Sequence, residues 1–119
     1  MQENRRIEQI NLSIIGIIII ILVLTHSIYL LLSEKKQILG FDSLTNEEFI
    51  TQALINRTIS FFVVLMFFIF ALENYNNNEN KNSDVLLRLT VSTLAFLSIT
   101  IELYLTIKNY IETIENKNH

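Results

Sequence analysis

An uncharged stretch of 25 residues, from Gln9 to Ser33, constrains this chain more than any other feature. Its centre is an almost unbroken aliphatic run on either side of Gly16. At about 1.5 Å per residue, a helix of this length exceeds the hydrocarbon core of a bilayer, which is about 30 Å thick. The β-branched residues would favour a strand in water, but a lone strand in lipid leaves its backbone amides unpaired. We therefore predict a transmembrane helix over about residues 10–32.

Two further apolar stretches predict two more spans. Residues 58–72 are uncharged and hold five phenylalanines, but 15 residues are too few to cross a bilayer alone. Thr45 and Glu48 form a capping-box pair upstream, so one helix should run from about Asn46 to Leu72. Its first turns would form an amphipathic segment at the membrane interface, before a span of about 55–72. The third stretch follows a capping residue, Ser83 or Asp84, and predicts a span of about 87–107.

Short polar segments separate these spans. Gly40 can adopt the left-handed conformation that ends a helix, so we expect the first helix to stop there, before a loop of about 40–45. Residues 73–83 include six asparagines and predict a second, solvated loop. The predicted fold class is all-α: residues 1–119 form a single three-helix transmembrane domain of an integral, multi-pass membrane protein.

Composition excludes several classes of function. The chain has no cysteine, which removes disulfides and thiolate chemistry, and nine basic against twelve acidic residues leave no footprint for nucleic acid. No nucleophile with a base, phosphate-binding loop or haem ligand pair is present, and nothing brings three metal ligands together. We expect neither an enzyme nor a cofactor or metal. The abundance of Ile, Asn and Lys favours a bacterial source.

Orientation in the membrane rests on a nearly balanced count of basic residues. With three spans, the N-terminus and the second loop share one side, which carries four Lys or Arg residues against five on the other. We therefore expect the N-terminus outside and the C-terminus inside the cell membrane.

Three ionisable residues fall within or beside the predicted spans. Glu102 lies inside the third span, His26 lies at a similar depth in the first, and Arg57 enters the second from the same side. An acidic side chain near the centre of a transmembrane helix costs about 3 kcal/mol on insertion scales, so we expect Glu102 to face His26 or Arg57 inside the bundle. These three residues form the predicted intramembrane polar cluster.

Small and polar residues on the third span predict its inward face. Ala95, Ser98, Glu102 and Thr106 recur at steps of three and four, which is typical of a helix interface or of a pore lining. In one interpretation the cluster titrates protons or binds a cation along a pore. In the other, which we favour, Glu102 is protonated or hydrogen-bonded across the helix interface, His26 bonds a neighbouring hydroxyl, and Arg57 reaches the headgroups.

Two functions are compatible with these features. The first is a small non-enzymatic accessory, regulatory or immunity-type subunit that acts with another membrane protein. The alternative is a homo-oligomeric pore or an ion- or proton-conducting protein lined by Ser98, Glu102 and Thr106. Three spans in such a short chain are similar in outline to small phage holins, but no motif is shared and the C-terminal tail here is neutral. The bilayer is a partner in either case, and three thin helices favour assembly with further copies or another subunit.

Overall fold

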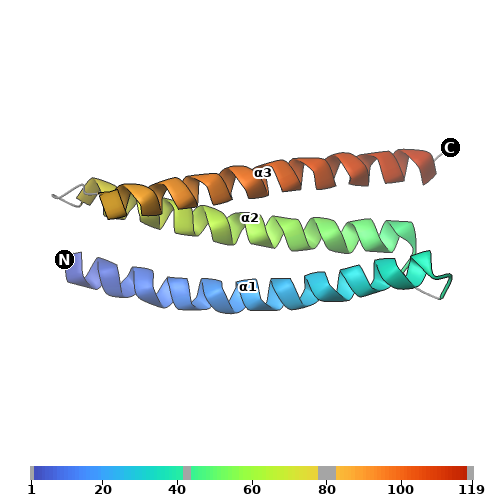
Figure 1. The fold of residues 1–119 in the computed structure, drawn as a ribbon, viewed down its shortest axis with the longest axis horizontal. Helices are drawn as coiled ribbons and strands as arrows, with labels where there is room; N and C mark the ends of the chain where they lie inside the picture. The colour runs from blue at the N-terminus through green and yellow to red at the C-terminus, as the bar shows by residue number, and fades with distance from the viewer. Residues whose placement is uncertain (1, 42–43, 78–82, 118–119) are drawn as a thin grey trace.

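The computed structural model describes residues 2–41, 44–77 and 83–117, and every element in them is a helix. The helices are α1 (Gln2–Ile38), α2 (Asn46–Asn77) and α3 (Ser83–Lys117). They run up, down and up, so the two ends of the chain lie at opposite ends of the bundle (Figure 1). Each helix is long and apolar enough to cross a membrane. The predicted all-α class with three such helices is confirmed.

Local sequence signals set the ends of the first hairpin. Gly40 has a φ of 84°, and its N–H and that of Phe41 donate to the carbonyls of Gln37 (3.2 Å) and Lys36 (2.9 Å). This pair of bonds is a Schellman motif, which satisfies carbonyls left free at the end of α1. At the start of α2, the Glu48 N–H donates to the Thr45 hydroxyl oxygen (3.2 Å), as a helix cap does. Both predicted helix ends are confirmed.

The helix α2 extends beyond the predicted boundary at Leu72. Residues 73–77 are helical, although their asparagine-rich composition predicted a loop, and residues 78–82 lie outside the described part. The cause lies in tertiary contacts, because Glu73 in this last part of α2 is bound by Arg5 and Gln9 of α1. Such contacts outweigh the weak helix propensity of asparagine.

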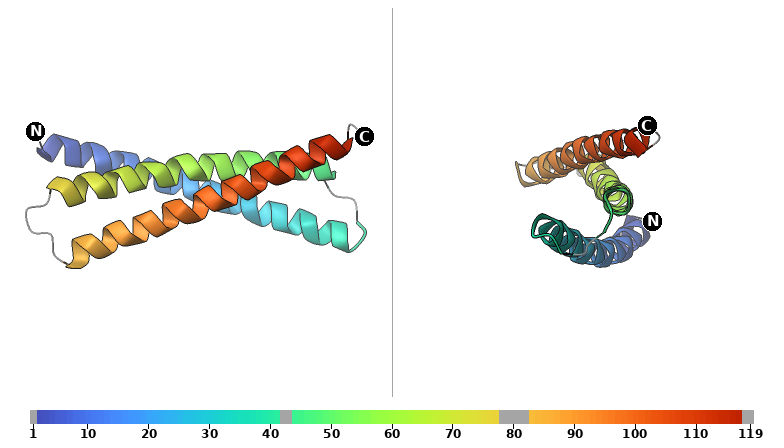
Figure 2. Two further views of the ribbon diagram at one scale, coloured as in Figure 1. Left: turned by 90° about the horizontal axis from the view of Figure 1, so that it is seen from above. Right: turned by 90° about the vertical axis from the view of Figure 1, so that its right-hand side faces the viewer.

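The helix α2 lies between α1 and α3 along the whole bundle (Figures 1 and 2). The bundle measures 57 × 24 × 23 Å. On α1, every seventh residue is buried: Gln9, Gly16, Val23 and Leu30. A seven-residue spacing is typical of helices that cross at about 20° in a left-handed bundle. At Gly16 the two helices approach closely, since a Cβ built there would lie 2.9 Å from Met66 Cε.

The distribution of polarity is the reverse of that in a water-soluble domain. Most of the large aliphatic side chains of α1 between residues 14 and 32 are about half exposed or more. The buried polar residues of the described chain outnumber the buried hydrophobic ones; they are Gln9, Ser33, Asn56, Ser60 and Thr106. A wide exposed apolar surface around a polar interior suits a membrane location.

Candidate functional site

A chain of polar side chains crosses the bundle from α1 through α2 to α3. At its centre is Asn56 of α2, which is only 2% exposed. Asn56 Nδ2 lies 3.0 Å from His26 Nδ1, and its Oδ1 accepts a 2.8 Å bond from Arg57 Nη1. At one end of the chain, His26 Nε2 lies 3.1 Å from Gln52 Oε1. At the other, Arg57 Nε lies 3.8 Å from Glu102 Oε2 in an ion pair.

The donors and acceptors in this series of polar side chains define the orientation of the Asn56 amide and the tautomer of the His26 ring. A guanidinium can only donate, so the Asn56 oxygen must face Arg57 and the amide nitrogen must face His26. His26 Nδ1 is then an acceptor, which leaves the proton of the neutral ring on Nε2, where it meets the oxygen of Gln52. The same amide nitrogen is also close to Val23 O (3.1 Å) and Ser27 Oγ (3.2 Å). Asn56 therefore ties α2 to the backbone and side chains of α1.

The predicted polar cluster is only partly assembled. Glu102 lies within ion-pair distance of Arg57, but its side chain is exposed at the side of the bundle instead of enclosed within it. The ring nitrogens of His26 are engaged by Gln52 and Asn56 instead of Glu102. Asn56, which the sequence analysis did not single out, connects His26 to Arg57, and Gln52, which it also missed, contacts the other ring nitrogen of His26. One signal could have revealed them: Gln52, Asn56 and Ser60 recur every four residues, which puts three polar side chains on one face of an apolar helix.

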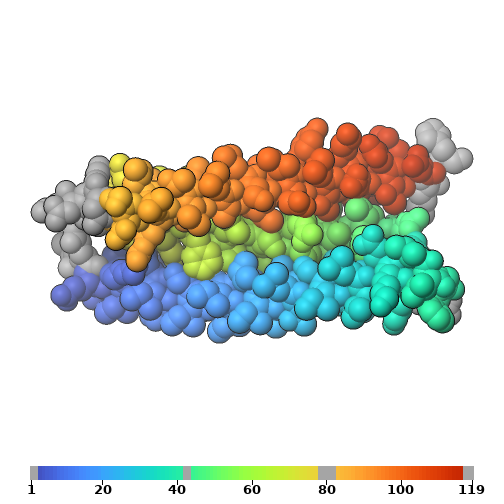
Figure 3. All heavy atoms as spheres, viewed as in Figure 1, coloured from blue at the N-terminus to red at the C-terminus, as the bar shows by residue number. Residues whose placement is uncertain are grey.

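A cleft of about 270 Å³ opens beside the ion pair, in the half of the bundle near the α1–α2 connection. All three helices contribute to it, and Figure 3 shows atoms of α2 in the furrow between α1 and α3. Arg57 is 36% exposed and Glu102 is 56% exposed as side chains. The polar residues that line the cleft are Ser27, Glu34, Arg57, Glu102, Thr106 and Asn109.

The residues of the predicted inward face of α3 differ in their burial. Thr106 is buried, and its hydroxyl donates to the backbone oxygen of Glu102 (2.8 Å), whereas Ala95 and Ser98 are exposed in this single chain. The face of α3 that packs on α2 carries larger and more apolar side chains than this predicted face. Phe96 lies at its centre, with its ring centroid 5.6 Å from that of Phe61 and 5.1 Å from that of Phe68.

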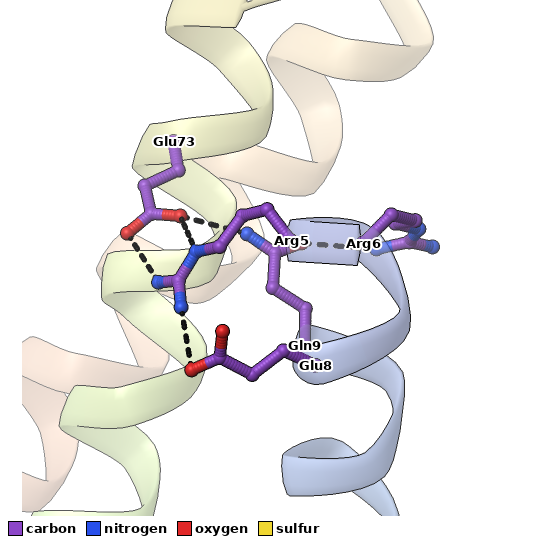
Figure 4. Close-up of polar contacts among 5 residues, drawn as sticks. All are labelled: Arg5, Arg6, Glu8, Gln9 and Glu73. Atoms are coloured by element: carbon purple, nitrogen blue, oxygen red, sulfur yellow. Dashed lines mark hydrogen bonds and ion pairs between the residues drawn. The ribbon is translucent and has the colours of Figure 1, made fainter. Parts of the chain in front are cut away.

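A second polar cluster joins α1 to α2 at the opposite end of the bundle (Figure 4). Arg5 donates to both carboxylate oxygens of Glu73, at 2.7 and 3.1 Å, and Gln9 Nε2 donates to the same carboxylate at 2.8 Å. Arg5 also pairs with Glu8 at 3.0 Å. We call Arg5, Gln9 and Glu73 the terminal clasp.

Arg5 and Glu73 lie just outside the uncharged stretches of α1 and α2, and Gln9 is the first residue of the stretch on α1. The hydrogen bonds from Arg5 lower the pKa of the Glu73 carboxyl, against a smaller opposing effect of burial, and the bond from Gln9 adds to the lowering. The same contact with Glu73 raises the pKa of Arg5. Both groups are therefore ionised at neutral pH.

These arrangements supply hydrogen bonds and charge. Within the described residues, no group of three His, Cys, Asp or Glu side chains could hold a metal ion. Comparisons with protein-family models, with curated proteins and with solved structures found no match.

Proposed function

We propose that this chain is an integral membrane protein that crosses the bilayer three times. The support is the exposed apolar surface of α1, the polar interior, and the 57 Å length of the bundle, which exceeds the roughly 30 Å hydrocarbon core. The ends of the bundle, including the terminal clasp and the first turns of α2, would lie in the headgroup regions. We further propose the orientation with the N-terminus outside and the C-terminus inside.

Within that membrane, we propose that the protein is a non-enzymatic subunit that assembles with another membrane protein chain, as an accessory, regulatory or immunity-type component. One observation carries the proposal: the Arg57–Glu102 ion pair is exposed in a cleft that opens to the side of the bundle. Each charge costs about 3 kcal/mol at the centre of a span facing lipid. A polar surface on a neighbouring chain removes this cost, because it supplies hydrogen bonds to the free oxygens and N–H groups.

The face that would receive the partner can be defined by heptad position. Ala95, Glu102 and Asn109 are spaced by seven residues, and all three are exposed in the single chain. Small residues such as Ala95 allow helices to approach closely in membranes. Leu97, Tyr104 and Ile111 have the same spacing but lie about 200° further round the helix, given 100° per residue.

Disulfide crosslinking in native membranes tests this assignment. The chain has no cysteine, so each single-cysteine variant reports on one position. We expect Ala95→Cys to form a crosslinked adduct, with a second copy or with another subunit, and the matched variant Leu97→Cys to remain monomeric. Equal crosslinking at both positions, or none at Ala95→Cys under conditions where a thiol reagent labels it, would refute the proposed face.

The 270 Å³ cleft favours a second candidate, a homo-oligomeric pore or proton- or ion-conducting protein of the channel-like or holin-like kind. Copies arranged around their polar clefts would line a path with Glu102, Thr106 and Asn109. Purified protein in liposomes distinguishes the two candidates. Ion or proton flux that rises with protein density and is lost in Glu102→Gln would support conduction, whereas tight liposomes with intact crosslinking at Ala95→Cys support assembly alone.

A further inference from the structure

A second cleft, of about 180 Å³, opens beside the terminal clasp, between the start of α1 and the end of α2. Among the described residues, every side chain that lines it carries N–H donors and none is a carboxylate. The lining residues are Arg5, Arg6, Gln9, Asn74 and Asn77. Guanidinium and amide groups together are the donors that bind phosphate oxygens in proteins.

The donors of the two arginines are used to different extents. Arg5 is engaged by Glu73 through Nε and Nη2 and by Glu8 through Nη1. Arg6 makes one hydrogen bond to the described residues, from Nη1 to Gln9 Oε1 at 3.3 Å. A guanidinium has five N–H groups, and within the part of the chain that the structure describes only one of those of Arg6 is engaged.

The nearby carboxylate of Glu73 is already hydrogen-bonded to residues of α1. Glu73 receives three hydrogen bonds, two from Arg5 and one from Gln9. Gln9 is 2% exposed, and it bonds Glu73 through its nitrogen and Arg6 through its oxygen, so the clasp also orients Arg6. Figure 4 shows the amide of Gln9 between Glu73 and Arg6, with a dashed line to each. Arg5 is shared between Glu73 and Glu8, and Arg6 supplies a second positive charge on the lining of the cleft.

The position of the cleft along the bundle identifies the source of the phosphate. Arg5 and Arg6 come just before the uncharged stretch of α1, and Asn74 and Asn77 come just after that of α2. In the membrane location proposed above, on which this step rests, the cleft lies at the depth of the lipid headgroups. We propose that it binds the phosphate group of an anionic phospholipid.

The other end of the bundle provides a matched control. Lys35 and Lys36 also lie just outside the apolar stretch of α1, but their neighbours in the cleft there are Leu32, Leu39 and Phe41. Lysines in such a setting attract anionic lipid only through general charge, without a set of amide donors. A phosphate site should therefore depend on Arg6, and general attraction should depend equally on Lys36.

Thermal unfolding of the detergent-purified protein, followed by circular dichroism, tests the site. The probes are short-chain phosphatidic acid, phosphatidylcholine of the same chain length, and inorganic phosphate without lipid. We expect phosphatidic acid, and not phosphatidylcholine, to raise the melting temperature of wild type and of Lys36→Gln. In Arg6→Gln the apparent affinity should fall about tenfold or more, the loss expected for about 1.4 kcal/mol of binding free energy. Arg6→Lys, which keeps the charge without the bidentate geometry, should be intermediate.

Three results would overturn the proposal. One is equal stabilisation by both lipids, and another is an equal loss in Lys36→Gln and Arg6→Gln. The third is full stabilisation by inorganic phosphate alone, which would make the free anion the ligand. Arg6 is exposed, so the unliganded melting temperature of Arg6→Gln should match wild type and shows whether the variant is folded. Crosslinking at Ala95→Cys does not involve this end, so failure of the lipid site and failure of the assembly proposal are distinguishable.

Discussion

Asn56 of α2 and His26 of α1 share a 3.0 Å contact in which the amide nitrogen faces the ring Nδ1. Since Arg57 occupies the amide oxygen, the orientation of Asn56 is linked to the tautomer of His26 on one side and to the position of Arg57 on the other. Arg57 in turn pairs with Glu102 of α3. One buried amide therefore couples all three helices.

Replacement of Asn56 should weaken the bundle more than any change at an exposed neighbour. Asn56→Leu removes the donor to Val23 O and the acceptor for Arg57, and it leaves the His26 ring nitrogen without its partner. We expect a loss of about 1–3 kcal/mol in unfolding free energy, measured by titration with a denaturing detergent. Ile55→Leu, at the exposed adjacent position, is the control and should change stability little.

Gly16 should tolerate alanine better than any larger residue. A Cβ at this position would lie 2.9 Å from Met66 Cε and 3.0 Å from Phe67 Cζ. The Met66 methyl is the far end of a flexible side chain and can move, so Gly16→Ala should retain the fold with a small loss of stability. Gly16→Ile should separate α1 from α2, seen as loss of a disulfide engineered between them. Equal stability of the two variants would contradict the close approach.

Substitutions of Glu102 distinguish the two candidate functions. Glu102→Gln preserves the shape and hydrogen bonding of the side chain, so assembly should survive, whereas Glu102→Leu should weaken it by about 1 kcal/mol or less for each lost contact. The readout is the yield of the Ala95→Cys adduct in each background. If Gln abolishes flux in liposomes while the adduct yield is unchanged, conduction replaces assembly as the function of this residue.

The terminal clasp should make stability depend on pH on the acid side. The pKa of Glu73 is lowered in the folded chain, so the ionised carboxylate stabilises the fold above the ordinary value of 4.5. This contribution is lost as the pH falls from that value through the lower folded pKa. Melting temperatures measured across this range should converge for wild type and Glu73→Gln as the pH falls. A constant difference between them would contradict the assignment, and Glu112→Gln, at an exposed position, serves as control.

The proposed topology makes a simple prediction for single-cysteine labelling. Lys36 lies at the end of α1 and Asn77 at the end of α2, at opposite ends of the bundle. In intact cells, a membrane-impermeant thiol reagent should label Asn77→Cys from outside and Lys36→Cys only after the membrane is opened. The reverse pattern would invert the orientation, and labelling of both from outside would contradict three spans.

The sequence by itself determined the three helices and several of their ends. Long uncharged stretches form helices in lipid because backbone groups must pair within the segment, and this holds whatever the neighbouring helices are. The ends at Gly40 and Asn46 depend on caps only a few residues long. The contact between Arg57 and Glu102 was also predictable, since two opposite charges at similar depth in a small bundle have few other partners.

Only the tertiary structure decided which face of each helix points inward. Hydrophobicity does not separate inside from outside in helices as apolar as these, whose large aliphatic side chains are mostly exposed. The rotation of α3 depends instead on how Phe96 packs against Phe61 and Phe68, so Ala95 and Ser98 are exposed despite their small size. The same holds for Asn56 and Glu73, whose partners on α1 lie 29 or more residues away in sequence. Contacts over such separations are set by the packing of whole helices, which no local pattern specifies.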